Sequence, residues 1–174
     1  DAFESCEDLT EIAIPESITK LPAQTFCQCS NLRKVTLPDS IVEILDSAFS
    51  ECESLTRIDI PESMEVICYH SFYGCSSLKD LSIASSIKVI GRRAFADCIS
   101  LERLVIPDSV IEIRSGAFRG CSNLTQLTLP KGVKVAKDAF EDCPVVIETD
   151  FEFYDSDTLY PVFTEFISGN IHCY

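Results

Sequence analysis

The sequence predicts a solenoid, a fold in which short coils of similar sequence stack along one axis. Its cysteines recur in five steps of 23 residues and one of 22: Cys6, Cys29, Cys52, Cys75, Cys98, Cys121 and Cys143. With small lapses, each unit also repeats one order of apolar residues, proline, serine and an Ala-Phe pair before its cysteine. A unit of this length cannot bury its apolar face alone, so it must stack on copies of itself.

The first half of each unit predicts a short strand. Ile58 and Ile60 alternate with the polar Arg57 and Asp59, which is the period-two signature of a half-buried strand. Pro61 lacks an N–H and cannot continue a hydrogen-bonded ladder, so we expect the strand to end there.

The second half predicts a short return segment and a tight turn. Ser63 can satisfy the backbone groups of a turn, and Met64 and Ile67 form the apolar pair of the return segment. The chain then carries Phe72 inward and closes on Cys75. Stacking in register would bring the equivalent rings into one buried column. They are Phe26, Phe49, Phe72, Phe95, Phe118 and Phe140.

The array is expected to form one elongated domain, residues 1–151, that begins mid-coil, because Ala2 and Phe3 match Ala48 and Phe49. An open first coil offers an unpaired strand edge, so an end-to-end dimer is one expected assembly.

Residues 152–174 are expected to form a C-terminal cap, because a repeat array needs its last coil covered. The segment 144–150 resembles a final strand, with Val146 in the leucine slot. A short helix is predicted over 157–168, where apolar residues share one helical face and Gly169 can end it. These residues are Leu159, Val162, Phe163, Phe166 and Ile167. The alternatives are an aromatic ligand patch or the entry to a further domain.

Composition narrows the classes of partner. The formal net charge is −14, from 28 acidic and 14 basic residues, which disfavours nucleic acid and anionic membrane surfaces. No apolar run approaches the length needed for insertion into a membrane.

Neither the cysteines nor the histidines predict a chemical site. A spacing of 23 residues lacks the paired ligands of a zinc site, and buried cysteines pack as small apolar residues. Cys27, Cys68 and Cys173 lie outside the column, and the sequence leaves their redox state open. Cys68 and His70 raise the question of a nucleophile and its base, but polar residues occupy the His70 slot in other units, which indicates a solvated position. We therefore predict no catalytic residue, metal or cofactor.

The outward positions of the first strands form three columns, which carry five basic and four acidic residues among 18 positions. Because the whole chain is acidic, this near-neutral face is the candidate for binding a protein partner. The predicted contact residues are Arg33, Lys34, Arg57, Asp59, Lys79, Asp80, Glu102 and Arg103.

The pattern L-x-x-I-x-I-P…I-x-x-I…AF-x-x-C resembles the treponemal-type (BspA-like) leucine-rich repeat. The resemblance implies a leucine-rich repeat solenoid, mainly β or α/β: a curved stack of about six to seven coils, with a parallel sheet on the concave face and short strands or 3₁₀ turns behind. It also implies a secreted or cell-surface protein, and some relatives adhere to host matrix proteins or other cells, although most have no assigned function. Ala84 replaces the usual proline, and the last unit lacks one residue between Pro130 and Val135, so local irregularity is expected at both places.

The expected function is a non-enzymatic protein-binding or adhesion module whose ligand meets the concave sheet. Two alternatives stay open at this point. One is a β-solenoid enzyme that acts on glycans, and the other is a spacer with a purely structural role.

Overall fold

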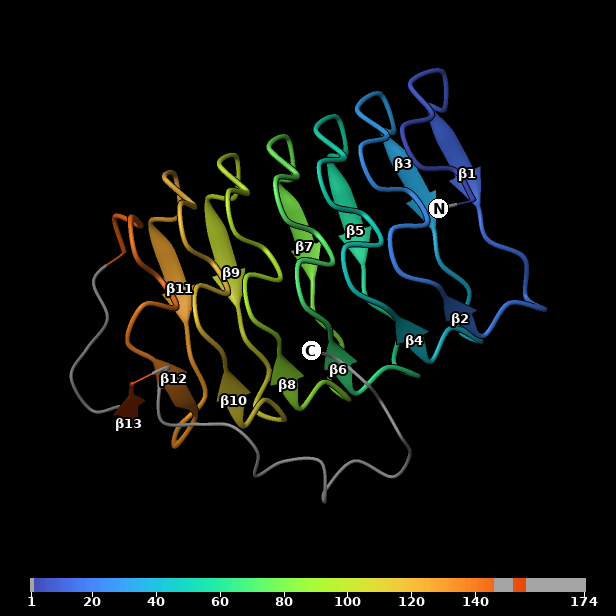
Figure 1. The fold of residues 1–174 in the computed structure, drawn as a ribbon. Coiled ribbons are helices and arrows are strands. Elements are labelled where there is room, and N and C mark those ends of the chain that lie inside the picture. The colour runs from blue at the N-terminus through green and yellow to red at the C-terminus, as the bar shows by residue number, and fades with distance from the viewer. Residues whose placement is uncertain (1, 146–151, 156–174) are drawn as a thin grey trace.

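The chain winds into a stack of coils with two rows of parallel strands (Figure 1). The computed structural model describes residues 2–145 and 152–155. The front row is built from the three-residue strands β1 Glu11–Ala13, β3 Lys34–Thr36, β5 Arg57–Asp59, β7 Asp80–Ser82, β9 Arg103–Val105 and β11 Gln126–Thr128. The back row is built from β2 Lys20–Leu21, β4 Glu43–Ile44, β6 Val66–Ile67, β8 Val89–Ile90, β10 Glu112–Ile113, β12 Lys134–Ala136 and β13 Glu152–Tyr154.

The period of the sequence sets the register of the front row. In β5 and β7 the parallel partners are Arg57 with Asp80 and Ile58 with Leu81, so like positions of successive units face each other. The front strands are hydrogen-bonded as three pairs, β1–β3, β5–β7 and β9–β11. The central residue of each front strand is apolar, points inward and packs against the core, while its two neighbours point outward.

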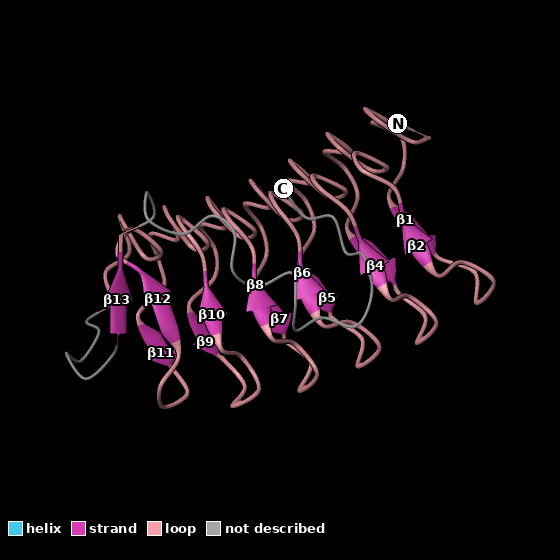
Figure 2. Ribbon diagram, turned by 60° about the horizontal axis from the view of Figure 1, so that its bottom comes forward, coloured by secondary structure: helices cyan, strands magenta, loops and turns pink. Residues whose placement is uncertain are grey.

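The back row is more continuous. Strands β6, β8, β10, β12 and β13 form one five-stranded parallel sheet, and β2 pairs with β4. The inward partners Ile67 and Ile90 are fully buried, which follows from the alternation of side chains along a strand. Figure 2 shows both rows running along the stack, and the described residues contain no helix.

A ladder of phenylalanine rings fills the interior. Seven rings, from Phe3 through Phe140, stack with centroids 5.2–5.5 Å apart and interplanar angles of 4–12°. Phe26, Phe49, Phe72 and Phe95 are essentially inaccessible to solvent. The predicted phenylalanine column is therefore confirmed.

The cysteine column lies beside this ladder and links successive coils. The Cys52 thiol donates a hydrogen bond to the Phe26 carbonyl at 3.2 Å, and the Cys75 thiol donates to the Phe49 carbonyl at 3.2 Å. The same contact recurs for four other cysteines of the column, namely Cys29, Cys98, Cys121 and Cys143. Cysteine fits this site because its side chain is small and its S–H group is a weak donor that can reach the phenylalanine carbonyl of the preceding coil.

The serine two residues after the proline slot acts between coils in several units, whereas Ser109 Oγ is buried without a hydrogen-bond partner among the described residues. Ser40 Oγ donates to the Ile18 carbonyl at 2.9 Å, and Ser86 Oγ donates to the Met64 carbonyl at 2.6 Å. The sequence predicted that this serine satisfies turn backbone. The structure adds that the satisfied carbonyl belongs to the preceding coil.

The two sequence irregularities have different outcomes. At Ala84 the turn keeps the ordinary geometry, with the Ile87 amide donating to the Ala84 carbonyl at 3.2 Å, so the irregularity predicted there is wrong. The turn needs only a carbonyl at this position, which alanine supplies as well as proline. In the last unit the shortened turn passes through Gly132 at φ 74°, and the strand that follows, β12, keeps its register with β10.

The fold class is confirmed as a parallel β-solenoid with 23-residue repeats, and short strands rather than 3₁₀ turns form its back row. The strand β13 falls within the predicted cap and continues the back sheet beside β12. The strand predicted over 144–150, apart from its first two residues, and the helix predicted over 157–168 lie outside the described residues. The domain boundary between 151 and 152 stays a prediction.

Candidate interaction surfaces

All eight predicted contact residues are exposed on the front row. Lys34, Arg57, Asp80 and Arg103 open their strands, and Asp59 closes β5. The remaining three stand one residue before a strand: Arg33, Lys79 and Glu102. The strand register therefore brings the predicted columns together as the period required.

One ion pair links two of these residues. Arg57 Nε lies 2.9 Å from Asp59 Oδ2, and Arg57 Nη2 lies 3.0 Å from Asp59 Oδ1, which is a two-pronged contact within one strand. The hydrogen bond from Asp59, together with its charge, raises the pKa of Arg57. A pair this exposed adds little to stability, so both groups stay available to a partner.

The central column carries charges of both signs, and two of its neighbouring pairs are of opposite sign. Glu11 lies beside Lys34 in β1 and β3, and Arg57 lies beside Asp80 in β5 and β7. Within the described part of the chain, Lys34 and Arg103 form no ion pair of 4 Å or less. The face is a mosaic of both signs rather than one basic patch.

Val105 is an apolar residue of this face that the contact prediction missed. Its side chain is 60% exposed at the end of β9, in a column that otherwise holds alanine, threonine, serine and aspartate. The available signal was its size: it is the one large apolar residue in a small and polar column.

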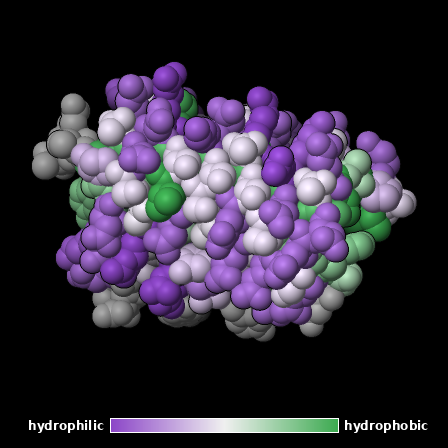
Figure 3. Space-filling view, turned by 90° about the horizontal axis from the view of Figure 1, so that it is seen from above, coloured by the Kyte–Doolittle hydropathy of each residue, from purple (hydrophilic) through white to green (hydrophobic). Residues whose placement is uncertain are grey.

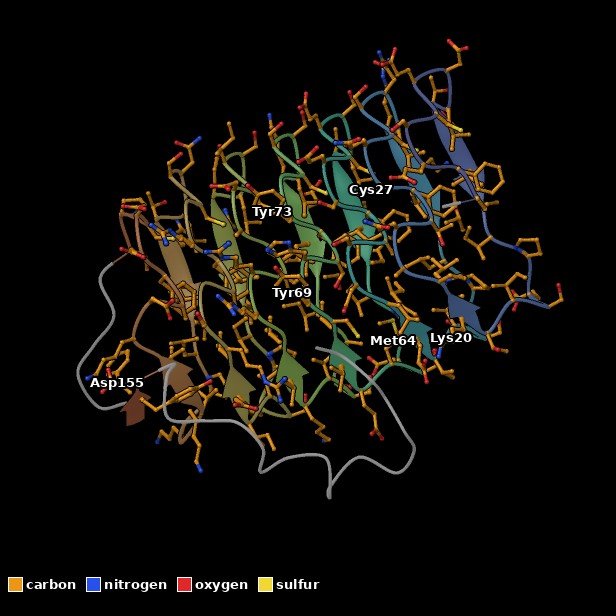
Figure 4. All side chains as sticks on the ribbon, viewed as in Figure 1. Lys20, Cys27, Met64, Tyr69, Tyr73 and Asp155 are labelled. Atoms are coloured by element: carbon orange, nitrogen blue, oxygen red, sulfur yellow. The ribbon has the colours of Figure 1, made fainter. Side chains whose placement is uncertain are left out.

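The turns between the two rows carry a second surface, an aromatic cluster of Tyr69, His70 and Tyr73. The His70 ring stacks on Tyr69 with centroids 3.8 Å apart and on Tyr73 with centroids 4.8 Å apart. Figure 4 shows both tyrosines on the segments that connect the rows in a central coil. The signal in the sequence was two tyrosines in slots that neighbouring coils fill with polar or small residues.

His70 was predicted to be solvated, and the structure corrects this. The residue is half-buried, and its Nε2 atom is buried without a hydrogen-bond partner among the described residues. Burial, followed by the charges of Arg93 and Arg92, lowers the pKa of His70. The equivalent position in other coils shares a left-handed backbone conformation, with φ of 54° at His70 and 61° at Gly116. The variety of residues at this position therefore reflects the backbone conformation and does not indicate exposure to solvent.

Cys68 is disulfide-bonded, which resolves one redox state that the sequence left open. A sulfur held in a disulfide cannot serve as a thiolate nucleophile, so the geometry removes the Cys68–His70 dyad. Cys27 is a free, half-buried thiol, and burial followed by the charge of Glu51 raises its pKa. Cys173 lies outside the described residues.

The fully buried column cysteines Cys75 and Cys98 are free thiols whose surroundings make them unreactive. Burial raises the pKa of the Cys75 thiol to about 12, and burial also raises the pKa of Cys98. A thiol that keeps its proton neither attacks electrophiles nor binds metal readily. Among residues 2–145 and 152–155, no three His, Cys, Asp or Glu side chains form a potential metal cluster.

The N-terminal end of the stack is apolar. Seen from above, the surface is mostly polar, and hydrophobic residues gather at the end that carries β1 (Figure 3). Phe3 is 42% exposed there, and its ring stacks on Phe26 alone among the described rings. An end-to-end dimer through this end stays a prediction.

The described residues form stacked coils with polar outer columns, and they enclose no catalytic or metal site. This arrangement is that of a parallel β-solenoid of the leucine-rich repeat class. The sequence matches the family model described as BspA type leucine rich repeat region, in six copies, over residues 1–114 and 42–156. The chain belongs to this family. The resemblance drawn from the repeat pattern is thereby confirmed.

Solved structures support the same assignment. A leucine-rich repeat protein of T. pallidum, TpLRR, is 38% identical with a TM-score of 0.72, and the match covers 77% of this chain and 62% of that one. A leucine-rich repeat protein from Bacteroides ovatus is 26% identical with a TM-score of 0.68, covering 86% of this chain and 46% of that one. A third, from Eubacterium ventriosum, is 24% identical with a TM-score of 0.65 over 92% of this chain and 46% of that one, and it shows the fold alone.

The chain thus spans less than two thirds of the length of these three relatives. A comparison with curated protein sequences gives no significant match. In the described residues, no helix has the length and apolar character needed to cross a membrane.

Proposed function

We propose that the chain is a non-enzymatic protein-recognition module whose ligand lies across the front row. The observation that carries the proposal is the charge contrast: five exposed basic and four exposed acidic residues make this face near-neutral on a chain whose net charge is −14. Such segregation steers and orients a charged partner.

The geometry of the front row suits a protein ligand. Six strands at the usual spacing of about 4.8 Å span about 25 Å, close to the width of a standard protein interface. The strands hold the charged columns on a rigid scaffold, so few backbone degrees of freedom are lost on binding. Val105 supplies an exposed apolar point beside Arg103 in the same strand.

The partner that fits best is a protein with an acidic surface, such as a host matrix or cell-surface protein. Arginine side chains make charge-assisted, two-pronged hydrogen bonds with carboxylates, and Arg33, Arg57 and Arg103 stand in different coils. These three would therefore engage separate groups of one ligand.

An extracellular or cell-surface location belongs to the same proposal. The Cys68 disulfide supports it, because such bonds persist in oxidising compartments outside the cytosol. The family resemblance implies the same location.

One observation favours binding over glycan hydrolysis. The outer front row carries no aromatic residue in its described strands, so a sugar ring has no stacking platform there.

The test is a matched pair of charge reversals. The front variant carries Arg33→Glu, Arg57→Glu and Arg103→Glu. The control carries the same number of reversals at exposed basic residues elsewhere, Lys88→Glu, Arg92→Glu and Lys131→Glu. Both variants change the net charge equally, so non-specific electrostatic effects cancel between them.

Affinity capture from host and microbial extracts would use the wild type and both variants in parallel. We expect the front variant alone to lose the captured protein, with at least a tenfold weaker Kd for the purified pair. Equal retention by the two variants would show that the front row is the wrong face. Release of sugar fragments from a glycan array would instead favour the enzymatic alternative.

A further inference from the structure

The turns that follow the back strands stack in register and form a third row, the turn row. The Ser47 amide donates to the Tyr69 carbonyl at 3.0 Å, and the His70 amide donates to the Arg92 carbonyl at 3.2 Å. Equivalent residues of successive turns therefore lie side by side, as they do in a parallel sheet. Tyr69 and Tyr73 lie on this row in the central coil (Figure 4).

The fold does not require the two tyrosines of the turn row. The positions equivalent to Tyr69 hold Ala23, Asp46, Arg92, Ser115 and Lys137, and those equivalent to Tyr73 hold Glu4, Cys27, Ser50, Ala96, Arg119 and Glu141. No other described coil thus places an aromatic residue at either position. A small or polar residue completes the same turn in every other coil, so packing of the solenoid alone does not explain the rings.

The three rings of the central coil form one ordered unit. His70 is held between Tyr69 and Tyr73, with ring centroids 3.8 Å and 4.8 Å away, and all three residues remain partly exposed. An ordered stack offers aromatic surface to a partner at little cost in side-chain entropy. His70 Nε2 is buried without a hydrogen-bond partner among the described residues, which lowers stability and is typical of residues that serve binding rather than folding.

Two arginines stand beside the rings, in the next coil. Arg92 is exposed and Arg93 is partly exposed, and within the described part of the chain neither lies within 4 Å of a carboxylate oxygen. One coil further on, Arg119 is paired, with its Nη1 atom 3.2 Å from Glu141 Oε2. On a chain with 28 acidic residues, two adjacent cations without such a contact are available to a carboxylate from outside.

We propose that Tyr69, Tyr73, Arg92 and Arg93 form a second binding surface, for a protein segment that carries a carboxylate beside an aromatic or aliphatic side chain. The carboxylate pairs with the arginines through charge-assisted hydrogen bonds, and the apolar side chain packs on the tyrosines. Tyrosine and arginine are also the residues enriched among those that dominate protein–protein binding energy. This surface is separate from the front row and does not depend on it.

Charge around the rings favours such a segment over a polyanionic glycan. Burial, followed by the charge of Asp97 and a hydrogen bond with it, raises the pKa of Tyr73, and the charge of Glu51 acts in the same direction. These two carboxylates border the Tyr73 side of the surface and repel negative charge there. A single carboxylate can lie at Arg92 and Arg93 and avoid them, whereas a chain of closely spaced anionic groups would meet both signs.

The surface is tested by selecting peptides from a random library displayed on phage. The bait is the front variant, with Arg33→Glu, Arg57→Glu and Arg103→Glu, so peptides that need the front-row arginines are not recovered. Peptides that still bind this variant after Arg92→Ser and Arg93→Ser are discarded. We expect the remaining peptides to carry Asp or Glu beside an aromatic or aliphatic residue. An absence of remaining peptides, or remaining peptides without a carboxylate, would overturn the proposal.

Titration calorimetry then measures the Kd of the selected peptides for variants of the otherwise wild-type full chain. One variant carries Tyr69→Ala and Tyr73→Ser, and the other carries Arg92→Ser and Arg93→Ser. Each new residue already stands at the same position of another coil, so both variants should fold, which circular dichroism checks. We expect the Kd to weaken at least tenfold in each variant, and a peptide with Gln or Asn in place of its acidic residue to weaken as much.

The matched control is Lys88→Ser with Lys131→Ser, which removes two exposed positive charges elsewhere. We expect less than a twofold change in Kd for this control. An equal loss in the control and in the arginine variant would overturn the proposal, as would binding that survives both test variants. Acidic glycans that bind through Arg92 and Arg93 while no peptide does so would overturn the protein occupant. A ligand of the front row should be retained when Arg92 alone is replaced, so the two surfaces are tested separately.

Discussion

Replacing Phe72 by alanine tests the stacked core most directly. Phe72 lies in the middle of the ladder, has no solvent exposure, and stacks on Phe49 at 5.4 Å and on Phe95 at 5.2 Å, each at 4°. The substitution removes a buried aromatic side chain and both of its ring contacts, and it leaves a cavity that rigid neighbouring coils cannot close.

The expected loss follows from these contributions. Burial of a phenylalanine side chain contributes about 1.5–3 kcal/mol, and each ring pair adds about 0.5–1.5 kcal/mol. Measured Phe→Ala losses in protein cores are about 3–5 kcal/mol, and we expect Phe72→Ala to fall in that range. Phe3→Ala is the matched control, because Phe3 is 42% exposed and has one stacked neighbour, and we expect it to cost about 1 kcal/mol.

Urea denaturation followed by far-ultraviolet circular dichroism measures both variants. The chain contains no tryptophan, so circular dichroism is preferred to intrinsic tryptophan fluorescence. Comparable slopes against urea in the two variants would allow their free energies of unfolding to be compared. Equal losses for Phe72→Ala and Phe3→Ala, or a loss below about 1 kcal/mol for Phe72→Ala, would refute the stacked-ring argument.

Three further predictions concern packing and ionisation. Gly91→Ala should lower the free energy of unfolding by about 1–3 kcal/mol in urea, because the new Cβ would lie 2.5 Å from the Ile67 carbonyl oxygen. Stability should fall as the pH drops below about 6.5, the ordinary histidine pKa, because folding lowers the pKa of His70 and the unfolded chain binds that proton more readily. His70→Gln, which restores the residue of the first coil, should flatten this dependence, and an unchanged slope between pH 7 and 5 would contradict the burial argument. At pH 8 a thiol reagent should modify Cys27 before Cys75 in the folded protein. Cys75 is fully buried and its pKa is raised to about 12, whereas Cys27 is only half-buried and stays accessible to the reagent. Early labelling at Cys75 by mass spectrometry would show that the column is open.

Much of the fold could be predicted because the repeat carries its own register. Phe72 and Cys75 were assigned inward positions from the period alone, and the ring ladder and the thiol–carbonyl contacts show them there. The family follows from the same pattern. Where the period lapses at Ala84, the prediction failed, because the neighbouring coils impose the turn even without proline.

The candidate surfaces were only partly predictable. The exposed front columns follow from alternation within each strand, so Arg57 and Arg103 lie where expected. The stacking of His70 between two tyrosines was missed, because it depends on how one turn orders three side chains in space. Val105 was passed over because its exposure depends on its surroundings rather than on its place in the pattern.

The sequence by itself determined which residues stack, since a repeat of constant length places equivalent side chains at equivalent heights in successive coils. It also determined which residue of each strand points inward, because strand alternation is local. Only the tertiary structure decided that Val66 and Val89 are buried in a cluster separate from the main core, and that Cys68 forms a disulfide while the described column cysteines stay free. These outcomes depend on the packing of segments distant along the chain, which a local pattern does not encode.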